Sequence, residues 1–182
     1  MPGLLDGADE LAADLGYLPV ALAQAAAVIA DDAISCAGFR RRIADRRSRL
    51  VDLFPDSSAD HYGRTLAATW ALALDRADAL PPTRLASHMA VLAATLDPNG
   101  IPESVVASES ACGYLATYGD PDHSDSNWVS DEDARRALRN LHRLSVVAHD
   151  PAAGHRSVRM HAMAQRATLE QADLYGPTGS RA

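Results

Sequence analysis

Alanine dominates this sequence and limits the folds that it can adopt. Of the 182 residues, 36 are alanine, whereas phenylalanine, tryptophan and tyrosine together make up 5%. Alanine has the highest helix propensity of any residue, and its small side chain lets helices pack closely while filling little core volume. A chain with so few large side chains builds its core most readily from closely packed helices. We therefore predict a mainly α-helical protein.

Regularly spaced apolar side chains predict a helical first half. Spacings of three and four residues are typical of helices that bury one face, and they predict helices over residues 9–15, 20–30, 37–54 and 63–80. Pro19 stands directly before the second helix, where proline costs little because the N–H that it lacks has no partner in a first turn. Pro81 and Pro82 follow the last helix. We therefore take residues 1–80 as one helical subdomain.

The periodicity changes in the second half. Helices are predicted over residues 83–96, with Thr83 as N-cap, and over 102–108, 134–144 and 162–174. Residues 146–149 and 157–160 instead have the composition of strands, and they flank turn residues 150–154, so we expect a β-hairpin. This order of elements is that of a winged helix-turn-helix. We therefore expect a helical bundle (1–80), a winged-helix-like subdomain with one small β-hairpin (81–175), and a flexible tail (176–182).

An acidic stretch precedes the helix at 134–144. Residues 119–133 hold six carboxylates and no arginine, which predicts a solvated loop. Ser130, near its end, is followed three residues later by Asp133. A hydroxyl with an acid or amide three residues on is close to the capping box that begins many helices.

Composition excludes several classes of protein. All 17 basic residues are arginine, and without lysine the chain cannot be a self-sufficient P-loop NTPase or a Schiff-base enzyme. The net charge of −7 argues against bulk attraction to nucleic acid or anionic membranes. No apolar run approaches the ~20 residues of a membrane span, and the N-terminus is acidic where a signal peptide is basic. We expect a cytoplasmic protein with two reduced, inert thiols, Cys36 and Cys112.

Catalytic and metal-binding motifs are not apparent in the sequence. The seven histidines show neither the HExxH pattern nor a zinc spacing with cysteine. His149, His155 and His161 surround the predicted hairpin and could approach a metal, but isolated surface histidines are commoner, so we predict no metal site. There is no GxSxG elbow and no GxGxxG loop. We expect no enzyme activity and no cofactor bound by this chain alone.

Four segments together carry a family resemblance. Residues 11–27 (LAADLGYLPVALAQAAA) resemble a GLPL motif, with Tyr17 between glycine and leucine. Thr69-Trp70 and residues 96–102 (LDPNGIP) are similar to bacterial members, and residues 159–165 (RMHAMAQ) resemble an MHD motif, with Ala162 in place of the aspartate. Over residues 8–172 the chain is similar to the distal part of an NB-ARC module, from the STAND signal-transduction ATPases.

The resemblance implies a regulatory role for the chain. In a full-length context, Pro19 would pack near the adenine and His161 would approach the β-phosphate of ADP. The nucleotide-binding core with its Walker loops is not represented, so ADP or ATP is implied only together with a core supplied elsewhere. Without that core, we expect Pro19 to act mainly as a helix start and His161 as a hydrogen-bonded joint.

We therefore predict a non-catalytic regulatory and interaction module that relays the nucleotide state of a core outside this chain. Its partners would be that core or an effector domain of a larger protein, and self-association through an uncovered patch of Leu15, Leu18 and Leu22 is left open. We expect neither nucleic acid nor membrane as a partner. A structural or interaction domain that masks its apolar patches by self-association is a further alternative.

The alternative from another class is a free-standing winged-helix transcription regulator. Four arginines of the 134–144 helix share the face opposite its leucines and could contact DNA: Arg135, Arg136, Arg139 and Arg143. However, residues 81–182 carry twelve acids against nine arginines. A solvated or protein-contacting arginine face is therefore the expectation.

Overall fold

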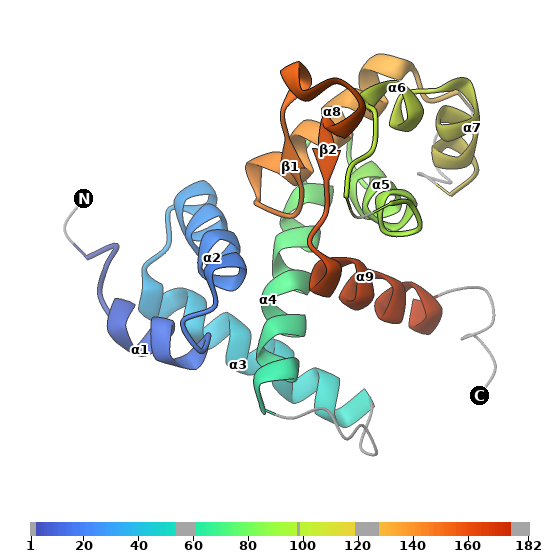
Figure 1. Ribbon diagram of the computed structural model, residues 1–182. Coiled ribbons are helices and arrows are strands. Elements are labelled where there is room, and N and C mark those ends of the chain that lie inside the picture. Colours follow the sequence, from blue (N-terminus) through green and yellow to red (C-terminus); the bar gives the residue numbers. More distant parts are fainter. Residues whose placement is uncertain (1–2, 54–60, 98, 119–127, 176–182) are drawn as a thin grey trace. The chain divides into compact units, whose positions relative to one another are not determined.

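The protein is described here by a computed structural model that covers residues 3–53, 61–97, 99–118 and 128–175 (Figure 1). It is mainly helical, with one small antiparallel sheet of two strands, as the composition predicts. The chain forms two compact units, Met1–Ala73 and Leu74–Ala182. This division falls inside one helix, whereas the sequence analysis places a boundary after that helix, at residue 80.

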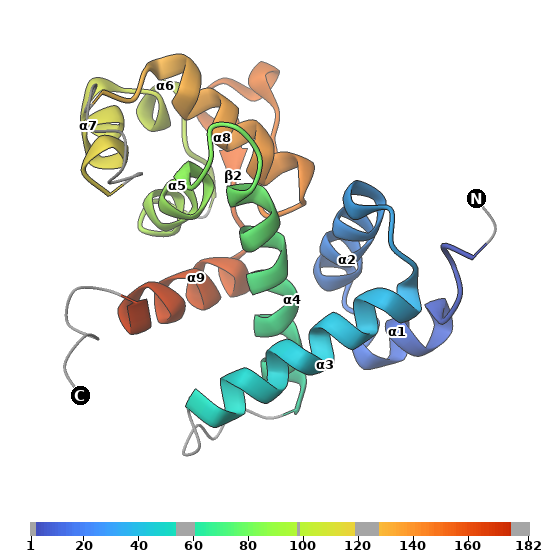
Figure 2. The ribbon, with the colours of Figure 1, turned by 180° about the vertical axis from the view of Figure 1, so that it is seen from behind.

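The first unit contains α1 (Ala8–Asp14), α2 (Pro19–Asp32), α3 (Cys36–Leu53) and the first part of α4 (His61–Asp78). α1 and α2 both pack against α3 (Figure 2). α2 begins at Pro19, one residue before the predicted start, and continues two residues past Ala30. It ends at Ala33, whose left-handed φ of 52° breaks the helical path. The buried apolar side chains of this unit include Leu11, Leu15, Val28, Phe39, Ile43 and Trp70.

Backbone groups and ion pairs fasten α3 in the first unit. The N–H of Cys36 donates to the Leu4 carbonyl at 2.9 Å, and the Ser35 hydroxyl accepts from the Gly38 N–H at 3.1 Å. Arg40 pairs with Asp14 at the end of α1, at 2.7 Å, and Arg42 pairs with Asp32 at the end of α2. Part of the arginine-rich face of this helix therefore serves to hold the other two helices.

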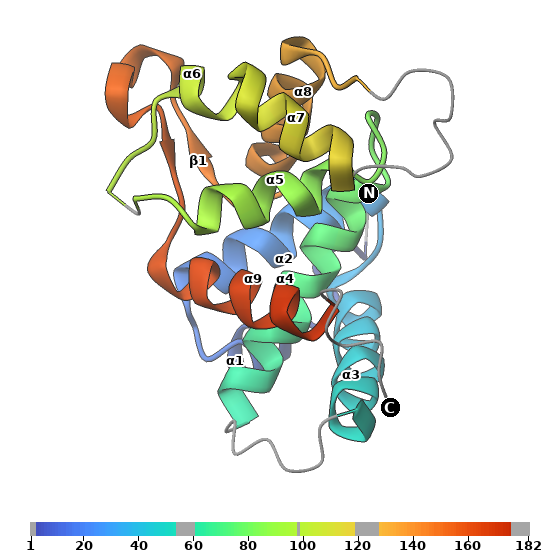
Figure 3. The same cartoon turned by 90° about the vertical axis from the view of Figure 1, so that its right-hand side faces the viewer.

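The second unit is built around one short apolar helix. Its helices are α5 (Leu85–Ala94), α6 (Glu103–Val106), α7 (Glu109–Tyr118), α8 (Asp131–Arg143) and α9 (Ala162–Tyr175). α5 lies between α7 and α9 and also packs against α8 (Figure 3). Its face is almost continuously apolar, with Met89, Ala90 and Ala93 fully buried. The core around it contains Leu115, Leu138, Leu141, Leu144, Val158 and Met160.

The start of α5 differs from the prediction. Thr83 is not its N-cap, because Arg84 precedes the helix in a left-handed conformation with φ 65° and caps it with no side-chain bond. The carboxylate of Asp78, at the end of α4, instead accepts the Ser87 N–H at 2.8 Å. The same aspartate accepts the Arg84 N–H through its carbonyl. The orphan N–H groups of the first turn are thus partly satisfied from the preceding helix.

α7 was not expected from the sequence. The N-cap of α8 was predicted at Ser130, but α8 begins at Asp131, so residues 131–133 are helical and not part of the expected loop. α7 buries only Ala111, Cys112 and Leu115 and carries an exposed glycine, which makes its helical pattern weak. Before α8, the Ser130 hydroxyl accepts the Asp133 N–H at 3.1 Å, and the Asp133 carboxylate accepts the Ser130 N–H at 3.4 Å. The expected capping box is therefore confirmed. The predicted loop 119–133 falls largely on residues outside those described, as does the tail 176–182.

The predicted hairpin is present, with shorter strands than expected. β1 (Ala148–His149) pairs antiparallel with β2 (Val158–Arg159), Ala148 opposite Arg159 and His149 opposite Val158. A 3₁₀ turn, η1 (Pro151–Arg156), joins them and extends two residues past the end of the expected loop at residue 154. On the other edge of β2, Ile101 exchanges two backbone hydrogen bonds with Val158, at 2.8 and 2.9 Å. A single residue thus extends the hairpin toward a third strand.

Within the described residues, no single helix combines the length and hydropathy needed to cross a membrane. α2 and the first part of α3 meet both criteria only as a pair, and this pair is bent by 110°.

Candidate functional site

The segment that contains Pro19 forms a sharp, exposed corner in the first unit. The Gly16 N–H donates to Ala13 and the Tyr17 N–H donates to Ala12, at 3.0 and 2.9 Å, which is the Schellman pattern that ends many helices. Gly16 adopts the left-handed φ of 61° that this motif requires, and Tyr17 follows with φ 56°. An aromatic residue in that region is strained, and strain of this kind is concentrated at functional sites.

The expected exposed patch of Leu15, Leu18 and Leu22 is not present as predicted. Leu15 is only 2% exposed, because it lies one helical turn after the buried Leu11, on the same inward face of α1. Leu18 and Leu22 are half-buried, whereas Pro19 is exposed and Tyr17 is 67% exposed. The tyrosine, which the sequence analysis treated only as an insertion in the motif, is therefore the most prominent apolar group here. Its position between a helix-ending glycine and a helix-starting proline is the signal that could have revealed it.

His161 lies in the second unit, between β2 and α9. It is exposed, and its Nδ1 accepts a hydrogen bond from the Met163 N–H at 3.2 Å. Its carbonyl accepts the Gln165 N–H at 2.9 Å. The imidazole therefore caps the first turn of α9, and an acceptor at Nδ1 directs the proton of the neutral ring to Nε2. Met163, beside it, is 47% exposed.

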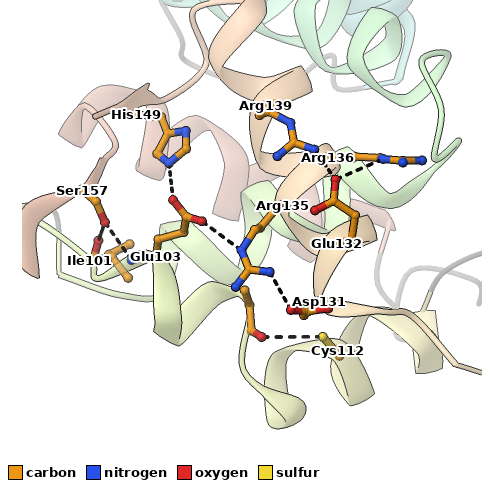
Figure 4. Close-up of polar contacts among 11 residues, drawn as sticks. Ile101, Glu103, Cys112, Asp131, Glu132, Arg135, Arg136, Arg139, His149 and Ser157 are labelled. Atoms are coloured by element: carbon orange, nitrogen blue, oxygen red, sulfur yellow. Dashed lines mark hydrogen bonds and ion pairs between the residues drawn. The ribbon is translucent and has the colours of Figure 1, made fainter. Parts of the chain in front are cut away.

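The arginines of α8 are engaged by carboxylates (Figure 4). Arg135 donates from Nε to Glu103 at 3.0 Å and from Nη1 to Asp131 at 2.6 Å. The Glu132 carboxylate accepts from Arg136 at 3.4 Å and from Arg139 at 2.7 Å. Arg143 is exposed in the last turn. Arg135, Arg136 and Arg139 are thus neutralised by acids, two of which lie in the first turn of the same helix.

These ion pairs keep the acids charged. The Arg135 guanidinium lowers the pKa of Asp131, and Arg139, followed by Arg136, lowers the pKa of Glu132. The hydrogen bond from His149, with a further contribution from Arg135, lowers the pKa of Glu103 despite its partial burial. At neutral pH the α8 surface is therefore a mixed array of opposite charges.

Glu103 is the centre of this array, and the sequence analysis did not single it out. One carboxylate oxygen meets Arg135, and the other lies 2.8 Å from Nε2 of His149, whose side chain is 9% exposed. The Glu103 N–H donates to the Ser157 hydroxyl at 2.7 Å, and that hydroxyl donates to the Ile101 carbonyl at 3.2 Å. Since Ser157 is buried and committed to the backbone, this carboxylate–imidazole pair is not joined to a serine nucleophile.

The thiols are placed where reactivity is low. Cys36 and Cys112 are both buried and unbridged. Burial raises the pKa of the Cys112 thiol, and the nearby Asp131 carboxylate raises it further. A thiol is nucleophilic only as its thiolate. Among the described residues, no three histidine, cysteine, aspartate or glutamate side chains are grouped as metal ligands.

Comparison of the chain with protein-family models, with curated proteins and with solved structures returned no match. The resemblance to NB-ARC modules therefore rests on the sequence segments quoted above. The two residues that it assigns to nucleotide contact belong to different units, Pro19 to the first and His161 to the second.

Proposed function

We propose that the chain is a non-catalytic, cytoplasmic regulatory module of a STAND-type ATPase. It would bind a nucleotide-binding core supplied elsewhere and relay the ADP or ATP state of that core to an effector. One observation favours this proposal over the DNA-binding alternative: Arg135, Arg136 and Arg139 of α8 are paired with carboxylates. A surface of alternating, already satisfied charges suits a protein partner better than a polyanion.

The architecture of the second unit supports a winged-helix assignment. Its order is α5, the single paired residue Ile101, α6 with α7, α8 and then the β1–β2 hairpin. In a winged helix, α8 would be the recognition helix and η1 the tip of the wing. Recognition helices read base edges with their N-terminal residues. Here those residues are Asp131, Glu132 and Asp133, which would repel DNA phosphates.

Two exposed features support contact with a nucleotide-binding core. The strained corner of Tyr17 and Pro19 presents an aromatic and a proline ring to a partner. His161 is held by its Nδ1 and therefore presents Nε2–H, a donor suited to a phosphate oxygen. Each feature stands at the start of a helix, which fixes its direction.

A trans-binding experiment tests the proposal. A separately produced P-loop core from a bacterial STAND ATPase is loaded with ADP or with a non-hydrolysable ATP analogue and titrated calorimetrically with this chain. We expect the two affinities to differ about tenfold, a typical allosteric coupling. His161→Ala should weaken binding to the ADP-loaded core roughly tenfold, as expected for loss of a hydrogen bond to a charged group.

His155→Ala is the matched control, because His155 is an exposed histidine on η1 outside the MHD-like segment 159–165. Equal binding of both nucleotide states, or equal effects of the two substitutions, would contradict the proposal. Salt-dependent binding of a defined DNA duplex that is lost in Arg135→Ala/Arg139→Ala would favour the transcription regulator instead.

A further inference from the structure

His142 lies in the last turn of α8 with one ring nitrogen between two backbone groups of the hairpin. Its Nδ1 is 3.2 Å from the N–H of His149, a donor, and 3.3 Å from the carbonyl of Val147, an acceptor. A nitrogen that carries a proton donates, and one without a proton accepts. We propose that His142 is a proton-operated clasp between α8 and β1, which exchanges its hairpin partner on protonation. The clasp does not rest on the proposed function.

The strand register explains why the His149 N–H faces this nitrogen. In an antiparallel ladder, hydrogen-bonded and non-hydrogen-bonded residue pairs alternate. Asp150 donates to the Ser157 carbonyl at 2.8 Å, so the next pair, His149 opposite Val158, is a non-bonded one. The His149 N–H therefore points away from β2, along the open edge of β1. His142 supplies the acceptor that an edge strand lacks.

The two charge states of His142 hold different atoms of the hairpin. When the ring is neutral with its proton on Nε2, Nδ1 accepts from His149 and holds the edge of β1. When the ring is protonated, both nitrogens carry hydrogen, so Nδ1 donates to Val147 and the His149 N–H loses its partner. Histidine side chains in general change charge between pH 5 and 8. Acidification over that range would thus release the edge of β1 while keeping the ring in place.

Charged groups from several elements surround this clasp. The His149 ring meets the His142 ring edge-on, with centroids 6.0 Å apart and planes at 83°, and the Glu103 carboxylate of α6 holds the far side of His149. Protonated His142 therefore faces a second imidazole that is itself hydrogen-bonded to a carboxylate. Among the described side chains, the elements packed against α8 add His88 of α5 and Glu109, Cys112 and Tyr114 of α7. The other charged groups of α8 itself are Asp131, Glu132, Asp133, Arg135, Arg136, Arg139 and Arg143.

Amide hydrogen exchange of the full chain tests the clasp. We expect the protection factor of the His149 amide, corrected for the intrinsic rate at each pH, to fall about fivefold between pH 8 and pH 5, the effect of losing one hydrogen bond. The ¹⁵N shift of His142 Nδ1 should report an unprotonated acceptor at pH 8 and a protonated nitrogen at pH 5. His142→Gln, at an exposed position, should make the His149 protection independent of pH.

His155→Gln is the matched control and should leave the pH response of the His149 amide unchanged. Three results would overturn the proposal: a His149 protection factor that is constant from pH 8 to pH 5, a pH response that persists in His142→Gln, or a protonated Nδ1 at pH 8.

Discussion

The two units of the chain are held together by different means. In the first unit, α1 and α2 begin without a side-chain cap, and α1 ends through backbone hydrogen bonds at Gly16 and Tyr17. In the second unit, polar side chains join separate elements, above all Glu103 and Ser157. The first unit also has such links, the ion pairs Arg40–Asp14 and Arg42–Asp32, but both arginines are well exposed to solvent, so the pairs add little stability. The first unit therefore depends mainly on apolar packing and backbone geometry. The second depends in addition on a few polar side chains, and it should respond more strongly to pH and to single polar substitutions.

The largest effects on stability are expected when one core side chain is truncated in each unit, so that the two units can be compared. Phe39→Ala in the first unit should lower its free energy of unfolding by about 3–5 kcal/mol, and Leu138→Ala should lower that of the second by about 2–5 kcal/mol, because both side chains are fully buried. Trp70 reports the first unit by fluorescence once Trp128→Phe removes the other tryptophan. Only Phe39→Ala should shift the Trp70 transition. An equal shift by Leu138→Ala would show that the units unfold as one.

Two glycines of the second unit should respond to alanine substitution in opposite ways, one losing and the other gaining stability. A Cβ at Gly100 would lie 2.8 Å from the backbone of Arg156, and its φ is 154°, so Gly100→Ala should destabilise the unit by about 1–3 kcal/mol. Gly113, inside α7, has no such neighbour within 4 Å. Gly113→Ala should therefore stabilise the helix by up to about 1 kcal/mol. Urea unfolding measures both, and destabilisation by Gly113→Ala would contradict the description of α7.

The smallest expected effect depends on pH. Because its folded-state pKa is lowered, Glu103 stabilises the second unit above its ordinary pKa of 4.5, and this stability is lost as the pH falls through the folded value. Glu103→Gln should cost about 1 kcal/mol at pH 7, a modest figure because the carboxylate is partly solvated. The difference from the unsubstituted chain should shrink as the pH falls below 4.5 and vanish only below the lowered folded-state pKa of Glu103.

Glu132→Gln is the control for this titration, since it removes a more exposed acid that also pairs with arginines of α8. Its effect on the free energy of unfolding should be smaller than that of Glu103→Gln. An equal loss in the two variants would show that burial and the His149 contact add nothing to the Glu103 ion pair.

The features that were predictable from the sequence are those encoded within a few residues. The long apolar helices, the capping box at Ser130 and the hairpin each have a local pattern, and all three are present. Glu103 contacts Arg135 and His149, which are distant in the sequence. No local sequence pattern predicts these contacts. The same holds for α5, whose cap comes from Asp78 and not from the adjacent Thr83. The burial of Leu15 could have been predicted, because it lies four residues after Leu11 and so shares the inward face of α1.

The hairpin loop is held by hydrogen bonds at its base, whereas its tip is exposed to solvent. All six residues of η1 are exposed, whereas Ser157 is buried and ties the base to Ile101 and Glu103. Over evolution, this loop should therefore drift in length and sequence around Ala152 and Ala153 while position 157 stays a small hydroxyl residue. For the engineer, the tip is a natural point at which to insert an epitope or a fluorophore-labelling tag with little risk to the fold.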